Sequence, residues 1–148
     1  MNETEQMILL VEDDPAEAML TQRALAKNRV ATRVMRVENG EEAVAYLDGE
    51  GSYQNRESHP WPTLVLMDIK LPRKSGLEVL EWIRSRGSIL RTLPVVMLTS
   101  SRHKIDLQRA YEYGANAYLT KPETTSELVE MLKSTQDFWL RFNELPPR

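Results

Sequence analysis

Residues 63–76 read TLVLMDIKLPRKSG, a short apolar run that ends on a carboxylate, Asp68, with a proline and a glycine soon after. An unbroken apolar run of this length is typical of a strand buried on both faces of a parallel sheet. Pro72 and Gly76 favour a loop between that strand and the next helix, because both residue types interrupt regular structure. The stretch therefore predicts a central strand whose carboxyl end carries a negative charge.

The rest of the chain repeats this alternation of strand and helix. Four further apolar or β-branched runs predict strands at 7–11, 33–37, 94–98 and 117–119, in addition to the one at 63–67. Amphipathic patterns predict helices at about 15–27, 40–47, 76–84, 104–113 and 125–142. Five strands alternating with five helices predict an α/β fold, a (βα)5 unit in which right-handed crossovers build a doubly wound parallel sheet.

Local signals mark several of the predicted helix ends. Asp14 followed by Pro15 is typical of an N-cap and a first helical residue. Gly114 can end the fourth helix in a left-handed conformation. Thr124 and Glu127 have the spacing of a capping box for the last helix.

Composition bounds the class of protein. With 148 residues, 41% hydrophobic and 28% charged, we expect a single globular domain over 1–148. The net charge of −3, from 19 basic and 22 acidic residues, argues against nucleic acid as a partner. No apolar run approaches the about 20 residues that cross a bilayer, so we expect no membrane contact and a cytoplasmic location. The absence of cysteine excludes disulfides and thiolate sites.

Acidic residues follow two of the predicted strands directly. The run MILLV leads into Glu12, Asp13 and Asp14, and the third run leads into Asp68. Ligands bind at the carboxyl ends of strands in an open parallel sheet, so adjacent strands would bring these carboxylates together. Their repulsion requires a cation, which a divalent metal ion or Lys121 after the fifth strand can supply.

Thr99 adds a hydroxyl at the end of the fourth strand, so every strand except the second places a polar group at this edge. Each residue taken alone has an ordinary structural role. Asp14 is read as a helix cap, and a threonine or a Lys-Pro pair after a strand is usually a cap or a surface turn. Their joint appearance, in order along the chain, favours a functional site.

Four motifs, ILLVEDDP, LVLMDIKLPRKSG, VVMLTSS and AYLTKP, resemble the signatures of the response-regulator receiver domain of two-component signalling. The resemblance covers about residues 6–133. It implies a five-stranded sheet in the flavodoxin-like order 2-1-3-4-5. It also implies a signalling protein that takes a phosphoryl group from a histidine kinase and catalyses only its own phosphorylation and dephosphorylation.

The resemblance further implies a role for individual positions. Asp68 matches the phosphoacceptor. Glu12 and Asp13 match the acidic pair that holds Mg²⁺ or Mn²⁺ together with Asp68, although aspartate is commonest where Glu12 stands. The backbone carbonyl of Lys70 would supply another metal ligand.

Three more positions match the phosphoryl-binding and switch residues of the family. Thr99 matches the hydroxyl that hydrogen-bonds the phosphoryl group, and Lys121 matches the ammonium that pairs with it. Tyr118 matches the switch aromatic. The peptide bond between Lys121 and Pro122 is commonly cis in this family.

Two features exceed a minimal (βα)5 unit: a long connection at 49–62 and an extension of the last helix at 134–148. Phe138, Trp139 and Phe142 in the extension are interface candidates and favour a homodimer, because exposed aromatics usually mark contacts. The alternative is that they fold back onto the domain, against the long loop and Trp61. Both features resemble regulators that serve phytochrome-type and other hybrid or sensory histidine kinases.

Several functions remain open. The leading hypothesis is phosphorylation-dependent protein contact without a DNA-binding output, since the residues after Lys121 form the fifth helix. The alternative within the family is a phosphorelay intermediate, or phosphate sink, that passes the group to another histidine protein. An aspartyl phosphohydrolase would want an acid where Lys70 stands. A flavin binder is disfavoured because the acidic residues 12–14 would repel its phosphate.

Overall fold

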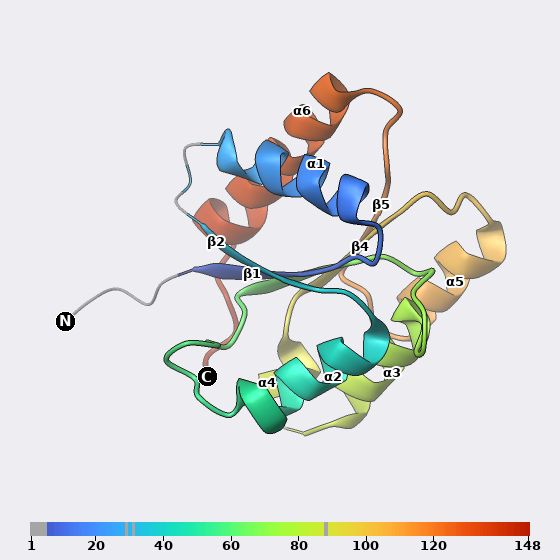
Figure 1. The fold of residues 1–148 in the computed structure, drawn as a ribbon. Helices are drawn as coiled ribbons and strands as arrows, with labels where there is room; N and C mark the ends of the chain where they lie inside the picture. The colour runs from blue at the N-terminus through green and yellow to red at the C-terminus, as the bar shows by residue number, and fades with distance from the viewer. Residues whose placement is uncertain (1–5, 29, 31, 88) are drawn as a thin grey trace.

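The computed structural model describes residues 6–28, 30, 32–87 and 89–148 (Figure 1). Its core is one parallel sheet in the order β2-β1-β3-β4-β5, which confirms the predicted doubly wound order. The strands are β1 (Met7–Val11), β2 (Arg33–Val37), β3 (Leu64–Met67), β4 (Val95–Thr99) and β5 (Ala117–Thr120). Each lies within one residue of its predicted bounds.

Helices cover both faces of the sheet (Figure 1). One face carries α1 (Pro15–Ala26) and α6 (Thr125–Gln136). The other carries α2 (Gly40–Asp48), α3 (Gly76–Ser85), α4 (Ile89–Thr92) and α5 (Lys104–Glu112). The single turn α4 and the 3₁₀ turn Gly51–Tyr53 in the long loop were not predicted, because elements this short show no periodicity. Within the described ranges, no helix is long and apolar enough to cross a membrane.

Alternate residues of each central strand enter two separate hydrophobic cores. In β1, Met7, Leu9 and Val11 pack toward α2 and α3, whereas Ile8 and Leu10 pack toward α1 and α6. All residues of β1, β3 and β4 are buried. Burial on both faces explains why these strands read as continuous apolar runs rather than as alternating ones.

The predicted helix caps form in part. Asp14 Oδ1 accepts hydrogen bonds from the amides of Ala16 and Glu17, as its position predicts. Gly114 has a φ of 105°, so it ends α5 in the left-handed region. Only half of the predicted capping box of α6 forms: the Thr124 hydroxyl accepts from the Glu127 amide, but it also donates to the Glu127 carboxylate, which therefore does not close the box.

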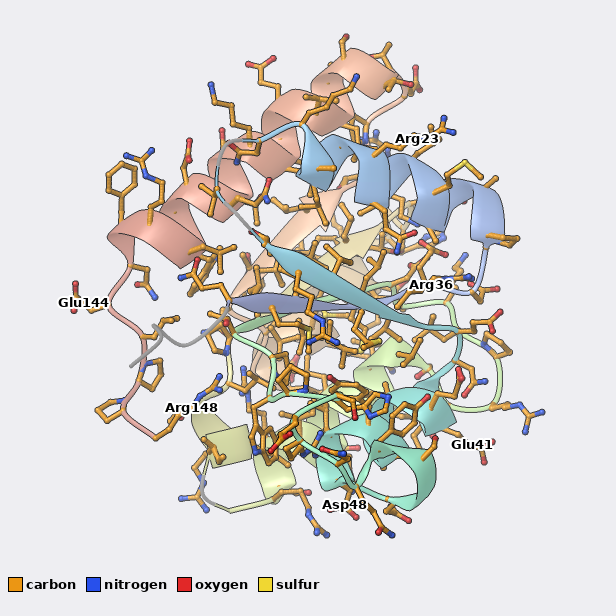
Figure 2. The ribbon with its side chains drawn as sticks, turned by 60° about the vertical axis from the view of Figure 1, so that its left-hand side comes forward. Arg23, Arg36, Glu41, Asp48, Glu144 and Arg148 are labelled. Atoms are coloured by element: carbon orange, nitrogen blue, oxygen red, sulfur yellow. The ribbon has the colours of Figure 1, made fainter. Side chains whose placement is uncertain are left out.

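The predicted continuous helix over 125–142 is wrong in its last part. The α-helix ends at Gln136 and passes into a π-helical segment, Asp137–Phe142. The wider winding lets Leu140 turn inward: its side chain is buried, and its carbonyl accepts a 2.8 Å hydrogen bond from the Gln6 side chain. Further on, Arg148 donates to the Pro62 carbonyl, so the chain end lies against the long loop, near α4 (Figure 2).

Arg84 joins the ends of α3, α4 and α5 beneath the sheet. Its guanidinium donates five hydrogen bonds of 2.7–3.1 Å, to the carbonyls of Leu90, Arg91, Leu93 and Gly114 and to the Asn116 side chain. A Cβ at Gly114 would lie 2.8 Å from Arg84, so glycine is needed there for packing as well as for its φ angle. Nη1 shares its two hydrogens among the carbonyls of Leu90, Arg91 and Leu93, and a lysine ammonium, with three donors in all, could not reach all five acceptors.

We expect Arg84→Met to lower the free energy of unfolding by about 2–4 kcal/mol, because partly buried acceptors lose their donors. Urea denaturation followed by circular dichroism measures the change. Arg91→Met is the matched control, since Arg91 is exposed and only its backbone carbonyl takes part. Equal stability of the two variants would contradict this role for Arg84.

Candidate functional site

An open cavity of about 580 Å³ lies at the carboxyl ends of β1, β3 and β4. We call it the acidic cavity. Its lining residues are Glu12, Asp13, Asp14, Glu17, Asp68, Lys70, Thr99, Ser100, Ser101, Arg102 and His103. One cavity is thus lined by five residues with predicted chemical roles, which follow or end three strands: Glu12, Asp13, Asp68, Lys70 and Thr99.

The strand register brings two carboxylates together. Val11 pairs with Met67 at the ends of β1 and β3, and the Asp68 amide donates to the Val11 carbonyl at 3.1 Å. Glu12 and Asp68 therefore leave neighbouring strands side by side. With Asp13 they form a group of three carboxylates whose ligand atoms lie within 4.8 Å of one another.

Lys121 supplies a positive charge to this group. Its Nζ lies 2.5 Å from Glu12 Oε1, 2.6 Å from Glu17 Oε1 and 3.1 Å from Asp68 Oδ2. Only 11% of the lysine side chain is exposed. The contacts with Glu12 and Asp68 follow from the predicted site. The contact with Glu17 was not predicted, because an acidic residue in the first turn of a helix is ordinarily interpreted as a favourable partner of the helix dipole.

Burial and charge act in opposite directions on this cluster. Burial raises the pKa of Glu12, although its hydrogen bonds with Lys121 and the Asp14 amide partly offset that effect. Burial alone would lower the pKa of Lys121. Its hydrogen bonds with Glu12 and Glu17 and the charge of Asp68 outweigh burial and raise the pKa, so the ammonium stays charged.

Lys121 reaches the carboxylates without a cis peptide bond. All described peptide bonds are trans, so the expectation of a cis bond between Lys121 and Pro122 is wrong for this structure. The trans form of a bond before proline is intrinsically favoured by about 0.5–1 kcal/mol. The long lysine stem spans the distance from β5 to the cluster in that form.

The backbone after β3 holds Asp68 in place. Its Oδ1 accepts a 2.7 Å hydrogen bond from the Ile69 amide, and the Gly76 amide donates to the Ile69 carbonyl at 2.8 Å. A Cβ on Gly76 would lie 2.0 Å from the Asp68 carbonyl oxygen. Gly76 is therefore required for the close return of the chain to the strand end.

Arg36 fixes the acidic turn after β1. It projects from β2 (Figure 2), and it donates from Nε to the Glu12 carbonyl at 3.0 Å and from Nη2 to the Asp13 carbonyl at 3.2 Å. The expectation that the second strand adds nothing to this edge is therefore wrong. An arginine inside a partly exposed strand reads as a surface charge, so the sequence carried no clear signal for this role of Arg36.

Thr99 and Tyr118 are connected through Ser101. The Thr99 hydroxyl accepts from the Ser101 amide at 3.3 Å, and the Tyr118 hydroxyl donates to the Ser101 carbonyl at 3.0 Å. The Ser101 hydroxyl in turn donates to Asp106 on α5 at 2.6 Å. Burial raises the pKa of Tyr118. Tyr118 is thus tied to the loop between β4 and α5 but does not line the acidic cavity.

The profile described as the response regulator receiver domain matches residues 8–133. The chain belongs to the receiver-domain family. Its doubly wound parallel sheet is the fold of this family, and it is also the fold that the alternation of strands and helices predicts. A receiver domain belongs to two-component signalling and partners a histidine kinase, rather than acting as a classical enzyme.

Three relatives of this receiver domain cover most of the chain. The response regulator Rcp1 of Synechocystis sp. is 37% identical over 140 residues, which cover 95% of this chain and 92% of Rcp1. The probable methanogenesis regulatory protein FilR2 of Methanothrix harundinacea is 38% identical over 143 residues, covering 95% and 87%. The phosphorylated cyanobacterial phytochrome response regulator RcpA is 40% identical with a TM-score of 0.89, covering 97% of this chain and all of RcpA.

The acidic cluster of this receiver domain suits a hard divalent cation. Glu12, Asp13 and Asp68 offer only oxygen ligands, which Mg²⁺ and Mn²⁺ prefer. A structure of Rcp1 in its Mn²⁺-bound form has a TM-score of 0.85 to this chain at 37% identity, covering 96% and 99% of the two chains. The donor set and the relative together identify a divalent-metal site.

The tail aromatics lie apart from this site. Phe138 and Trp139 line a separate groove beside β5, with Ala117, Leu119 and Met131 among the other lining residues. Trp139 packs partly into the core on the α1 and α6 side, whereas 52% of Phe138 and 66% of Phe142 are exposed. Trp139 therefore folds back onto the domain, but not against the long loop and Trp61 as that hypothesis had it, because Trp61 packs against the other core. The two phenylalanines remain available for contact.

We expect Asp13→Asn to weaken Mn²⁺ binding at least about tenfold, because a charged oxygen ligand is lost from the cluster. Isothermal titration calorimetry measures the affinity. Asp14→Asn is the matched control: it removes a neighbouring charge in the same cavity, yet asparagine caps a helix as well as aspartate. Equal loss of affinity in both variants would contradict a specific ligand role for Asp13.

Proposed function

We propose that Asp68 accepts a phosphoryl group from a phosphohistidine on a histidine kinase. The observation that carries the proposal is the position of the Asp68 carboxylate, which lies in one cluster with Glu12 and Asp13 and 3.1 Å from the Lys121 ammonium. Phosphoryl transfer demands positioning and neutralised charge more than covalent chemistry from the protein. This arrangement supplies both.

In the transfer, the bond between phosphorus and the imidazole nitrogen breaks and a bond from phosphorus to an Asp68 oxygen forms. The electron pair returns to the imidazole, which takes a proton from solvent. Lys121 neutralises one oxygen of the moving group, and the buried Thr99 hydroxyl donates to another. Mg²⁺ or Mn²⁺ held by Glu12, Asp13, Asp68 and the Lys70 carbonyl would neutralise further charge.

The signal leaves the site through Thr99 and Tyr118. A phosphoryl group that draws the Thr99 hydroxyl toward it changes the loop at Ser101, and the Tyr118 hydroxyl bonds to that loop. This is a local charge event that biases a two-state element. Ile105 and Tyr111 on α5 are about half exposed, so the affected surface has apolar side chains to offer a downstream protein.

The kinase is of the phytochrome or hybrid type in this proposal, since RcpA is described as a phytochrome response regulator. A relay intermediate or phosphate sink that passes the group to another histidine protein is the alternative. A long lifetime of phospho-Asp68 favours an output regulator, and rapid back-transfer to a histidine phosphotransfer protein favours the relay. In either case the chain catalyses only its own phosphorylation and dephosphorylation.

We expect Asp68→Asn to abolish uptake of phosphate from acetyl phosphate in the presence of Mg²⁺, because the amide is not a nucleophile for this transfer. Phosphate-affinity electrophoresis measures uptake. Asp14→Asn, in the same cavity, should keep it. Labelling of the Asp68→Asn protein at the unaltered rate would refute the assignment.

A second copy of the chain is the proposed occupant of the surface around Phe138 and Phe142. The groove of about 670 Å³ at Phe138 runs beside β5, an edge strand of the sheet, so two copies can bury both the aromatic rings and the strand edge. Aromatic side chains are enriched at the centres of such interfaces.

We expect the double change Phe138→Ser and Phe142→Ser to weaken self-association, shifting the sedimentation profile toward the monomer. Both phenylalanine side chains are at least half exposed, so the fold should survive, whereas cutting the chain after Gln136 would also remove the buried Leu140. Ile105→Ser with Tyr111→Ser is the matched control on the α5 surface. An unchanged profile in the tail variant would rule out this interface.

A further inference from the structure

The ammonium group of Lys121 has no donor to spare. An ammonium carries three N–H donors and accepts nothing. In the structure, Nζ has three carboxylate partners, on Glu12, Glu17 and Asp68, at 2.5, 2.6 and 3.1 Å. A phosphoryl oxygen can therefore gain this ammonium only if one of the three carboxylates gives it up.

The three partners differ in the cost of losing the lysine. The Glu12 side chain is only 4% exposed, so water cannot take the place of the lysine at this buried carboxylate. Asp68, at 12%, carries the incoming group and stays beside the ammonium. The Glu17 side chain is 41% exposed, so water can replace the lysine at little cost. Glu17 is the partner that leaves.

The structure places Glu17 well for such an exchange. It lies in the first turn of α1, where its amide is capped by the Asp14 carboxylate at 3.3 Å. It lines the acidic cavity, and it also lines a neighbouring cavity of about 400 Å³ that includes Lys121 and Pro122. Glu17 thus stands where the two cavities meet and holds the ammonium at that boundary.

We propose that Glu17 is a positioning residue for the phosphoryl group: it holds Lys121 before phosphorylation and releases it when the group binds at Asp68. The proposal rests on the proposed function of Asp68. Because the contact between Glu17 and Lys121 exists only in the unphosphorylated form, it stabilises that form and opposes phosphoryl binding. Glu17 therefore sets how readily the site accepts the group.

The test uses beryllofluoride, a mimic of the phosphoryl group that adds to a carboxylate, with the full chain and saturating Mg²⁺. We expect Glu17→Gln, which keeps the shape of the side chain and removes its charge, to bind beryllofluoride roughly two- to fivefold more tightly, as the loss of a partly exposed ion pair predicts. Fluorine NMR of bound and free fluoride measures the affinity. Unchanged or weaker binding by Glu17→Gln would overturn the proposal.

Two controls separate the held lysine from a general loss of negative charge. Glu123→Gln removes an exposed charge that lines the same neighbouring cavity, and we expect its affinity to stay unchanged. In a Lys121→Ala background, Glu17→Gln should give no gain, because there is no ammonium to release. An equal gain with and without Lys121 would also overturn the proposal.

The outcome for Glu17 can be told apart from the outcome for Asp68. If the unaltered chain binds beryllofluoride, Asp68→Asn abolishes binding and Glu17→Gln changes nothing, the inference about Glu17 falls alone. If the unaltered chain fails to bind beryllofluoride, the proposed function falls and the inference falls with it. If Glu17→Gln binds beryllofluoride more tightly only when Lys121 is present, the result supports both the proposed function of Asp68 and the inference about Glu17.

Discussion

A single ammonium group offsets part of the negative charge at the edge of the sheet on which the chemistry depends. Lys121, after β5, joins Glu12 after β1, Asp68 after β3 and Glu17 on α1. Carboxylates this close repel one another strongly unless a cation lies among them. Because Glu12 is buried, removal of the lysine would leave an unpaired charge in the interior. Lys121 thus lessens the repulsion among the carboxylates that the paired strand ends bring together.

The sheet makes this cluster possible through register. Val11 and Met67 are paired at the ends of β1 and β3, so the residues that follow them emerge side by side. The buried strands β1 and β3 hold Glu12 and Asp68 in place at their carboxyl ends. Gly76 lets the following loop pass close to the Asp68 backbone. An anchored carboxylate beside an exchangeable cation is what reversible acceptance of a phosphoryl group requires. The contacts of Lys121 with Glu12 and Asp68 therefore affect both the stability of the fold and the proposed signalling.

The sequence was sufficient for the sheet and for the residues at its strand ends, because apolar runs and the charges after them are local patterns. Contacts that depend on how elements meet were missed: Arg36 reads as a surface charge and Glu17 as a helix-dipole complement until the fold brings each to the acidic cavity. The π-helical segment was read as a continuous α-helix, since the aromatic spacing fits both windings until the burial of Leu140 is known.

The central claim is that Asp68 is the residue that carries the phosphoryl group. The most direct measurement is reduction of the phosphorylated, unaltered chain with borohydride, which converts an aspartyl phosphate to homoserine, followed by peptide mapping in a mass spectrometer. We expect homoserine at position 68, dependent on both the phosphodonor and Mg²⁺. Homoserine at position 13 or 14, or stable phosphate on a histidine or a hydroxyl residue, would contradict it.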